Sequence, residues 1–313
     1  MTNKTRVGVV GVGYLGSIHA RIYAKMPNVD LVGVVDLDPS VAKKVGSECN
    51  CDYYNSPEQL IGEVDAVSIV VPTTLHREVA DLYIDNGIDI LLEKPVAHTV
   101  PEAEALVRNA EEKGIILQVG HLERFNAGVV ALADMLKKPK FFEVHRLGTF
   151  VERATDVDVI TDLMIHDIDI VLSLVDSPLS RVHAVGTKVV TSHVDIANAR
   201  LEFEDGTVAN VTASRVSSKK FRRIRVFADS CYLALNFADQ QLEIVRPQTS
   251  VKEGSRFPEI LQERKKIEPR PPLDAELEHF IECVVNRKQP LVGGADGLEA
   301  LKVAEIVQRE IGR

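Results

Sequence analysis

Apolar residues in the first 120 positions follow two alternating patterns. Short runs rich in Val and Ile, without polar positions between them, are typical of strands buried on both faces of a sheet. These runs are Arg6–Gly11, Val29–Asp36, Val64–Val71, Ile88–Glu93 and Ile115–Gly120. Segments with one polar side predict helices between them, at Leu15–Lys25, Pro39–Val45, Leu75–Asn86 and Pro101–Lys113. Regular alternation of strand and helix predicts a doubly wound parallel sheet, a Rossmann fold.

The pattern changes after Gly120. Helices are predicted at Glu123–Lys137 and Ile160–Val175, and otherwise strands follow one another without helices between them. The predicted strands are Phe141–Phe150, Val182–Val190, Ile196–Phe203, Val208–Ser214, Arg223–Phe227, Tyr232–Phe237 and Leu242–Val245. Successive strands, with a hairpin signal at residues 204–206, predict a large open sheet that is mainly antiparallel.

The end of the chain completes this organisation. The charged, proline-rich stretch Arg246–Pro272 predicts an irregular excursion. Helices at Leu273–Asn286 and Gly297–Ile311 are expected to pack back towards the first domain. We therefore expect an α/β protein with a Rossmann domain over residues 1–120 and an α+β domain over residues 121–313.

Composition narrows the possible functions. The 313 residues are 45% hydrophobic and 27% charged, with no apolar run near the roughly 20 residues of a membrane span. The N-terminus lacks the pattern of a signal peptide, so we expect a cytoplasmic protein. A net charge of −9 argues against binding to nucleic acid. The four cysteines, Cys49, Cys51, Cys231 and Cys283, lack metal-ligand spacing and are interpreted as reduced thiols.

Residues 11–16, Gly-Val-Gly-Tyr-Leu-Gly, form a G-x-G-x-x-G pattern. It follows a predicted strand and opens a helix, and Asp36 ends the next strand 20 residues after Gly16. In this context the glycines allow a tight turn, approach of a pyrophosphate and close helix packing. Asp36 can bind the adenosine ribose and repels a 2′-phosphate, which favours NAD over NADP. The alternative is a structural glycine turn that binds no nucleotide.

Two further strand ends carry polar residues. Pro72 and Thr73 end one predicted strand, and Lys94 and Pro95 end the next. Ligands of open α/β sheets bind at the carboxyl ends of the strands, so both ends are expected to border the ligand crevice. Lys94 would there stabilise negative charge developing on a substrate alcohol. The alternative is a surface Lys-Pro in an ordinary loop.

The predicted helix after residue 160 carries Asp162, His166 and Asp169. Positions i and i+4 share a helix face, so Asp162 and His166 are expected to project together. A histidine beside carboxylates can be held in one tautomer and act as a base. The alternatives are a capping aspartate followed by a buried histidine, or a metal site, for which the sequence offers no convincing further ligands.

Taken together, these motifs resemble those of the glucose–fructose oxidoreductase, inositol dehydrogenase and MocA (Gfo/Idh/MocA) family, over essentially the whole chain. The resemblance implies that Lys94, Asp162 and His166 are catalytic and that the open sheet mediates homodimers or homotetramers. It implies that Glu93 lies by the nicotinamide ribose. The cofactor-binding set it predicts is Gly11, Gly13, Tyr14, Leu15, Gly16, Asp36, Pro72, Thr73, His76, Glu93 and Lys94.

A narrower resemblance is to the nucleotide-sugar branch of the family, above all UDP-N-acetylglucosamine 3-dehydrogenases. It rests on residues 120–126, Gly-His-Leu-Glu-Arg-Phe-Asn, and on residues 161–169. It implies that Arg124 and Asn126 bind the substrate together with Asp162 and His166. Ala127 departs from this branch, in which a proline is usual, and this puts the start of the following helix in doubt.

The resemblance predicts NAD-dependent oxidation of a sugar C3 hydroxyl. The product would be a keto sugar, suited to a downstream aminotransferase. No metal, membrane or nucleic acid is expected to take part. Two alternatives stay open: a dehydrogenase of a polyol, an inositol or a free sugar, and a non-catalytic NAD-sensing protein on the same fold. The presence of both Lys94 and His166 argues against the sensor.

Overall fold

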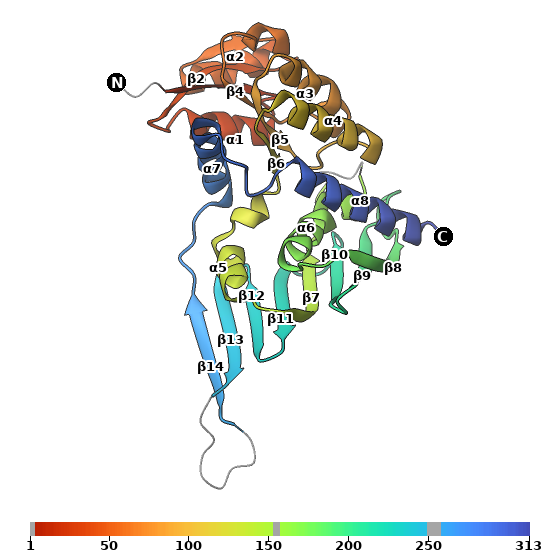
Figure 1. Cartoon of the computed structure of the whole chain (residues 1–313). Helices are drawn as coiled ribbons and strands as arrows, with labels where there is room; N and C mark the ends of the chain where they lie inside the picture. Colours follow the sequence, from red (N-terminus) through yellow and green to blue (C-terminus); the bar gives the residue numbers. More distant parts are fainter. Residues whose placement is uncertain (1–3, 153–156, 249–257) are drawn as a thin grey trace. The chain divides into compact units, whose positions relative to one another are not determined.

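The computed structural model describes residues 4–152, 157–248 and 258–313. The chain forms two compact units (Figure 1). The first unit combines Met1–Phe125 with Pro271–Leu301, and the second combines Asn126–Arg270 with Lys302–Arg313. Each unit is therefore assembled from two separate stretches of the sequence.

The first unit contains a six-stranded, wholly parallel sheet in the order β3-β2-β1-β4-β5-β6. Its strands are β1 (Thr5–Val10), β2 (Val29–Val35), β3 (Asp52–Tyr54), β4 (Ala66–Ile69), β5 (Asp89–Glu93) and β6 (Leu117–Gly120). Five of these strands and the parallel arrangement confirm the sequence prediction. The sequence did not predict β3, because this edge strand is only three residues long and begins with an exposed aspartate.

Helices cover both faces of this sheet. They are α1 (Tyr14–Tyr23), α2 (Pro39–Cys49), α3 (His76–Asp85), α4 (Val100–Lys113) and α7 (Pro272–Asn286), with short 3₁₀ turns at Pro57–Leu60, Thr73–Leu75 and Leu122–Phe125. Tyr83 and Leu106 of α3 and α4 pack in one apolar cluster, while Tyr23 of α1 and Phe280 of α7 pack in another. Each cluster includes residues of the central strands, so the sheet is buried on both faces.

The second unit contains an eight-stranded sheet in the order β14-β13-β12-β11-β7-β10-β9-β8. Neighbouring strands are antiparallel except for β7 and β10, which are parallel. The strands are β7 (Pro139–Leu147), β8 (Leu179–Thr187), β9 (Ile196–Phe203), β10 (Val208–Ser214), β11 (Phe221–Ala228), β12 (Cys231–Asn236), β13 (Gln241–Pro247) and β14 (Ile260–Lys266). The mainly antiparallel sheet confirms the predicted fold class.

The prediction of a wholly irregular stretch at 246–272 was wrong. Its second half contains β14, which pairs with β13 along seven residues. The sequence disguises this strand because Glu263, Arg264, Lys265 and Lys266 follow one another in it. Charged residues of this kind are common on edge strands, where they discourage pairing with other chains.

The helices of the second unit begin differently from the predicted ones. The predicted helix at 123–137 is divided into a 3₁₀ turn and α5 (Ala127–Met135). The predicted helix at 160–175 is divided into a π-helical turn (Ile160–Met164) and α6 (Ile165–Leu174). Contacts join α5 to β12 and β13, and α6 to β7 and β10. The last helix, α8 (Gly294–Ile311), spans the division between the two units.

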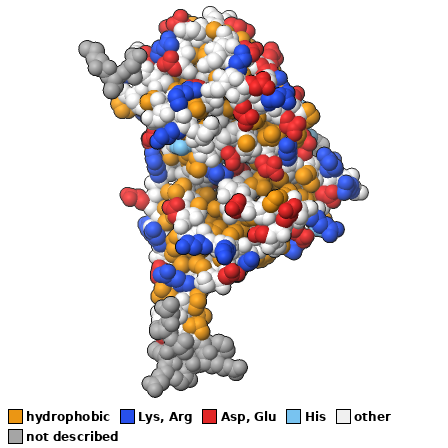
Figure 2. All heavy atoms as spheres, in the orientation of Figure 1, with side chains coloured by type: hydrophobic (Ala, Val, Ile, Leu, Met, Phe, Trp, Pro, Cys, Tyr) orange, Lys and Arg blue, Asp and Glu red, His pale blue; other side chains and the backbone are white. Residues whose placement is uncertain are grey.

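Surface charge and helix composition bear on possible partners. On the face drawn in Figure 2, the side chains of Lys and Arg interleave with those of Asp and Glu, and the described residues form no continuous basic surface there. In the described parts of the chain, no helix is long and apolar enough to cross a bilayer.

Candidate active site

The glycine turn joins β1 to α1 in the first unit. Gly11 has a φ of +84°, and a Cβ atom there would lie 2.7 Å from the carbonyl oxygen of Val70. A Cβ atom on Gly16 would lie 1.9 Å from the carbonyl oxygen of Gly11. A Cβ atom on Gly13, by contrast, would meet no atom of the described residues within 4 Å. The turn is therefore closed on its protein side at Gly11 and Gly16 and open at Gly13, which suits the approach of a pyrophosphate.

Asp36 lies where β2 ends, beside this turn. Its Oδ2 accepts the backbone N–H of Val12 at 3.0 Å, and its Oδ1 accepts that of Asp38 at 3.0 Å. A cavity of about 800 Å³ begins here, lined by Gly11, Gly13, Asp36, Leu37, Pro72 and Val79, among others. An apolar wall with a carboxylate at its rim suits adenosine with free ribose hydroxyls, so the residues present fit NAD.

His76 begins α3 and is buried. Its Nδ1 lies 2.9 Å from the carbonyl oxygen of Pro95, and its Nε2 lies 3.0 Å from that of Val71. A neutral imidazole has a single N–H and donates only one of these two contacts. Burial lowers the pKa of His76. The ring therefore links the end of β4 to the turn after β5, whereas its role towards the cofactor stays a prediction.

Glu93 is the last residue of β5 and Lys94 and Pro95 follow it, joined by a cis peptide bond. The buried carboxylate of Glu93 lies 3.4 Å from Nε2 of His19 and accepts the backbone N–H of Lys94 at 3.3 Å. A side chain on Gly120 of the neighbouring strand would come within 3.0 Å of this carboxylate. Neighbours on two elements thus define the position of Glu93.

His121 is a further residue of this region, which the sequence analysis did not assign to the site. It is fully buried after β6. Burial, and then the positive charges of Lys94 and Arg124, lower its pKa to about 3. His121 is therefore neutral near pH 7. The positive charges of Lys94 and Arg124 both act on this buried imidazole.

Arg124 and Asn126 lie on either side of the division between the units. Arg124 is half-buried in a 3₁₀ turn and donates from Nη2 to the carbonyl oxygen of Leu291 at 3.3 Å. Asn126 is buried, and its Oδ1 accepts the backbone N–H of Gly128 at 3.0 Å, which caps α5. The helix therefore begins at Ala127 without the proline that the narrower resemblance led us to expect.

Asp162 and His166 belong to the second unit. Asp162 lies in the π-helical turn, where the N–H of Ile165 bonds to the carbonyl oxygen of Ile160, and His166 lies in the first turn of α6. The sequence predicted a regular α-helix through both residues, but the observed turn is one residue wider at Asp162. π-helical turns occur frequently at functional sites. His166 is 9% exposed and Asp162 is half-buried, so both side chains lie at the edge of the core.

The residue after His166 holds this helix to the sheet. Asp167 accepts two hydrogen bonds from Arg146 of β7, at 2.9 and 2.7 Å. Both side chains are buried, and the guanidinium also lies over the ring of Phe237. A bidentate buried pair fixes orientation as well as position. Across the described ranges, no three His, Cys, Asp or Glu side chains are grouped so that they could hold a metal ion.

Both parts of the chain match domains of one protein family. The NAD-binding Rossmann domain of the Gfo/Idh/MocA oxidoreductase family matches residues 5–121, and the Gfo/Idh/MocA C-terminal domain matches residues 137–233. Among curated relatives, UDP-N-acetylglucosamine 3-dehydrogenase of Acidithiobacillus ferrooxidans is 36% identical over 96% of this chain and 95% of its own length. The scyllo-inositol 2-dehydrogenase (NAD(+)) of Bacillus subtilis is 28% identical over 97% of this chain and 93% of its own.

Solved structures agree with these sequence matches. The structure of the Acidithiobacillus ferrooxidans enzyme superposes with a TM-score of 0.91 at 35% identity, covering 98% of each chain. An oxidoreductase from Agrobacterium radiobacter, solved with NAD+, L-tartaric acid and magnesium, has a TM-score of 0.88 at 17% identity over 99% of this chain and 97% of its own. The second likeness concerns the fold alone.

Proposed function

Because the chain belongs to the Gfo/Idh/MocA family of oxidoreductases, we propose that it oxidises a hydroxyl group of a nucleotide sugar, with UDP-N-acetylglucosamine as substrate and C3 as the position. The enzyme is a dehydrogenase with NAD as its cofactor. The observation that carries the choice of substrate is the 36% identity, over nearly the full length of both chains, to a UDP-N-acetylglucosamine 3-dehydrogenase.

The proposed chemistry gives each candidate catalytic residue one role. His166 takes the hydroxyl proton, and Asp162 orients the imidazole. Lys94 stabilises the alkoxide that forms as the proton leaves. NAD, when bound, supplies the acceptor for the hydride that leaves the carbon bearing this hydroxyl. His121 is neutral near pH 7, so it adds no further positive charge to those of Lys94 and Arg124.

The proposal assigns substrate recognition to Arg124 and Asn126. A guanidinium fork suits the oxygens of a diphosphate. Arg124 is half-buried, and its Nη2 contact to the backbone of Leu291 orients its planar guanidinium. The side-chain oxygen of Asn126 accepts from the backbone of Gly128, which fixes the position of this buried carboxamide at the start of α5.

A second candidate is oxidation of a free polyol. The relatives that support it are inositol dehydrogenases, which match at 28% and 24% identity over nearly the whole chain. These identities are lower than that of the nucleotide-sugar relative, so the polyol is the weaker candidate. Under this alternative His166 and Lys94 keep their roles, and Arg124 has no diphosphate to bind.

The test is formation of NADH by the purified protein with NAD and a panel of UDP-sugars, inositols and free sugars. Turnover of UDP-N-acetylglucosamine, with chemical analysis of the product at C3, is the expected result. Turnover of an inositol alone would support the second candidate and overturn the first. NAD binding without any turnover would favour a sensor.

Variants test the assigned roles in the same assay. His166→Ala and Lys94→Ala are each expected to lower kcat about 10²- to 10⁴-fold. Exposed residues of the same type, in the substitutions His183→Ala and Lys44→Ala, are the matched controls and are expected to leave kcat unchanged. Loss of activity in the controls, or full activity in the first pair, would contradict the assignment.

A further inference from the structure

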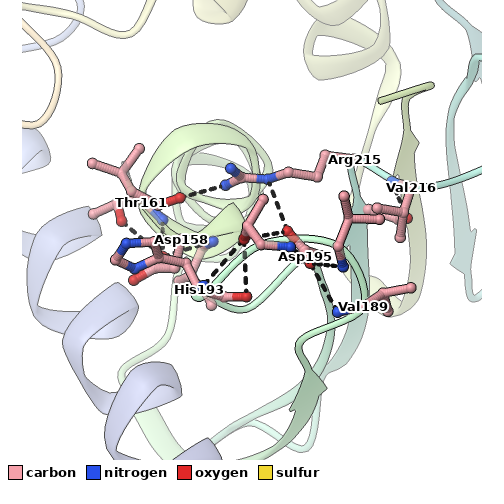
Figure 3. A network of polar contacts seen from close by, with 12 residues as sticks. Asp158, Thr161, Val189, His193, Asp195, Arg215 and Val216 are labelled. Carbon is pink, nitrogen blue, oxygen red and sulfur yellow. Dashed lines mark hydrogen bonds and ion pairs between the residues drawn. The ribbon is translucent and has the colours of Figure 1, made fainter. Parts of the chain in front are cut away.

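A group of polar side chains from distant parts of the sequence surrounds the start of the segment that carries Asp162 and His166 (Figure 3). At its centre is the carboxylate of Asp158. Its Oδ1 accepts the backbone N–H groups of Ile160 and Thr161, each at 2.9 Å, and the hydroxyl of Thr161 at 2.7 Å. These bonds satisfy the first donors of the π-helical turn and fix where it begins.

The other side of Asp158 is held as well. Its Oδ2 accepts a hydrogen bond from the side chain of Gln308 in α8 at 2.7 Å. Its own carbonyl oxygen accepts the backbone N–H of Asp162 at 3.2 Å. Every displacement of Asp158 is therefore passed directly to the backbone of Asp162, four residues later.

Arg215, directly after β10, fixes the residue before Asp158. Its Nη2 donates to the carbonyl oxygen of Val157 at 2.7 Å, and its Nε lies 3.9 Å from Oδ1 of Asp195. The side chains of Arg215 and Asp195 are 6% and 0% exposed. The guanidinium thus joins the approach to the π-helical turn to a carboxylate in the loop between β8 and β9.

Asp195 is the anchor of this group. Its Oδ2 accepts three backbone N–H groups, from Val189, Val190 and Thr191, at 2.7 to 2.9 Å, and its Oδ1 accepts the hydroxyl of Thr191. Donors so numerous hold the pKa of Asp195 well below its usual range. Its backbone also accepts the N–H of Arg215 and donates to Thr187. The carboxylate is therefore rigid and charged.

Two ionic side chains placed in a core are costly, and apolar residues of similar volume often serve stability equally well. The group nevertheless lies at the first turn of the segment with the two candidate catalytic residues, where that turn departs from regular α-helix. Precise placement of a reacting group has a large effect on rate, since an error near 1 Å costs about 100-fold. A role in placing Asp162 would explain why Asp195 and Arg215 are charged, whereas stability alone does not.

We propose that Asp195 and Arg215 are positioning residues for the dehydrogenase reaction, which fix Asp162 and His166 by holding Val157 and Asp158 at the start of the π-helical turn. This inference rests on the proposed function, in which Asp162 and His166 act on the substrate hydroxyl. It adds to that function two side chains, Asp195 and Arg215, that lie far in the sequence from Lys94 and from the segment with Asp162 and His166.

The variants that test it are Asp195→Asn, which keeps the shape of the side chain and removes its charge, and Arg215→Lys, which keeps the charge and removes the hydrogen bond from Nη2 to Val157. Each is expected to lower kcat about 10- to 100-fold while the Kd for NAD, whose predicted site lies in the other unit, stays unchanged. The pH profile of kcat is expected to shift, because the imidazole of His166 is less well oriented. Amide hydrogen exchange is expected to accelerate within residues 158–166.

Arg200→Met is the matched control, since it removes an exposed ion pair with Glu202 on β9 of the same sheet. It should alter neither kcat nor exchange. A lower melting temperature for Asp195→Asn and Arg215→Lys, with kcat, pH profile and exchange at 158–166 unchanged, would overturn the inference and leave a purely structural group. If Asp195→Asn does not fold, Arg215→Lys decides.

Asp162→Ala separates this inference from the proposed function. Loss of activity in Asp162→Ala with full activity in Arg215→Lys would sink the positioning role alone. Full activity in Asp162→Ala would sink the catalytic assignment, and the positioning role with it.

Discussion

The two units hold their candidate catalytic residues by different physical means. In the first unit Lys94 follows β5 directly, and the backbone around it is held by hydrogen bonds to two single side chains, those of Glu93 and His76. In the second unit Asp162 and His166 lie on a helical segment held by buried ions, namely the Arg146–Asp167 pair and the Asp195–Arg215 pair. The first arrangement depends on close backbone geometry and the second on charge.

This difference determines which substitutions should destabilise each unit. Close backbone contacts, such as those at Gly11 and Gly16, leave no space for an added methyl group. A charge network instead tolerates small changes of shape but not the loss of one partner. Substitutions that add a methyl group should therefore damage the first unit most. Substitutions that remove a single charge should damage the second most.

The largest effect is expected for Gly16→Ala in the glycine turn. The new methyl group would lie 1.9 Å from the carbonyl oxygen of Gly11, so α1 must move away from β1. We expect the free energy of unfolding to fall by about 5 kcal/mol or more, measured by urea denaturation.

Gly13→Ala is the matched variant, because a methyl group there meets no atom of the described residues within 4 Å. We expect its free energy of unfolding to stay within about 1 kcal/mol of wild type. Its Kd for NAD, measured by calorimetry, should rise about 10-fold or more, since the predicted pyrophosphate approaches at this residue. Unchanged NAD affinity in Gly13→Ala would contradict the predicted placement of the pyrophosphate.

The comparison also explains what the sequence could reveal. In the first unit the informative features are local: three glycines, an acid at a strand end and a Lys-Pro after a buried strand. Their spacing reflects strand and turn geometry, so the fold class and most strands were predicted. Position 120 is a glycine because a side chain there would meet Glu93. This contact depends on the pairing of β5 with β6, which the sequence does not show.

In the second unit the important contacts join residues far apart in the chain. Asp158 meets Gln308, 150 positions away, and Arg215 meets Val157, 58 positions away. Periodicity also cannot detect a π-helical turn, because one wide turn leaves the apolar pattern nearly unchanged. Asp162 was one candidate for the helix cap, but Asp158 makes the capping bonds. The available signal was Asp158 itself, since aspartate is among the residues preferred at helix N-caps.

A second prediction concerns the buried ion pair of the second unit. Arg146→Met removes one partner and leaves the carboxylate of Asp167, whose side chain is 2% exposed, without its bidentate donor. We expect the free energy of unfolding to fall by about 3–5 kcal/mol, measured by urea denaturation.

Two control variants sharpen this measurement. Arg200→Met removes a pair whose side chains are 44% and 32% exposed, and should cost at most about 1 kcal/mol. The double substitution Arg146→Met with Asp167→Leu should recover part of the loss, because no buried charge remains. Equal losses in the single and double variants would show that packing, rather than the uncompensated charge, explains the effect.

The smallest expected effect is on the pH dependence of stability, which should differ between His121 of the first unit and Asp195 of the second. His121 has a pKa of about 3 in the folded enzyme, against about 6.5 when unfolded, so between pH 6.5 and 3 the unfolded chain binds the proton more readily than the folded one. Stability should therefore fall by roughly 1.5 kcal/mol between pH 6.5 and 5 on account of this residue, and His121→Gln should remove that part of the slope. Asp195 has a lowered pKa instead, so its contribution is complete above its unfolded pKa of about 4 and is lost only below it. Asp195→Asn should consequently leave the slope between pH 6.5 and 5 unchanged. An NMR titration in which the ring of His121 in the folded protein protonates above pH 5 would contradict this prediction, because His121 would then contribute little to the loss of stability between pH 6.5 and 5.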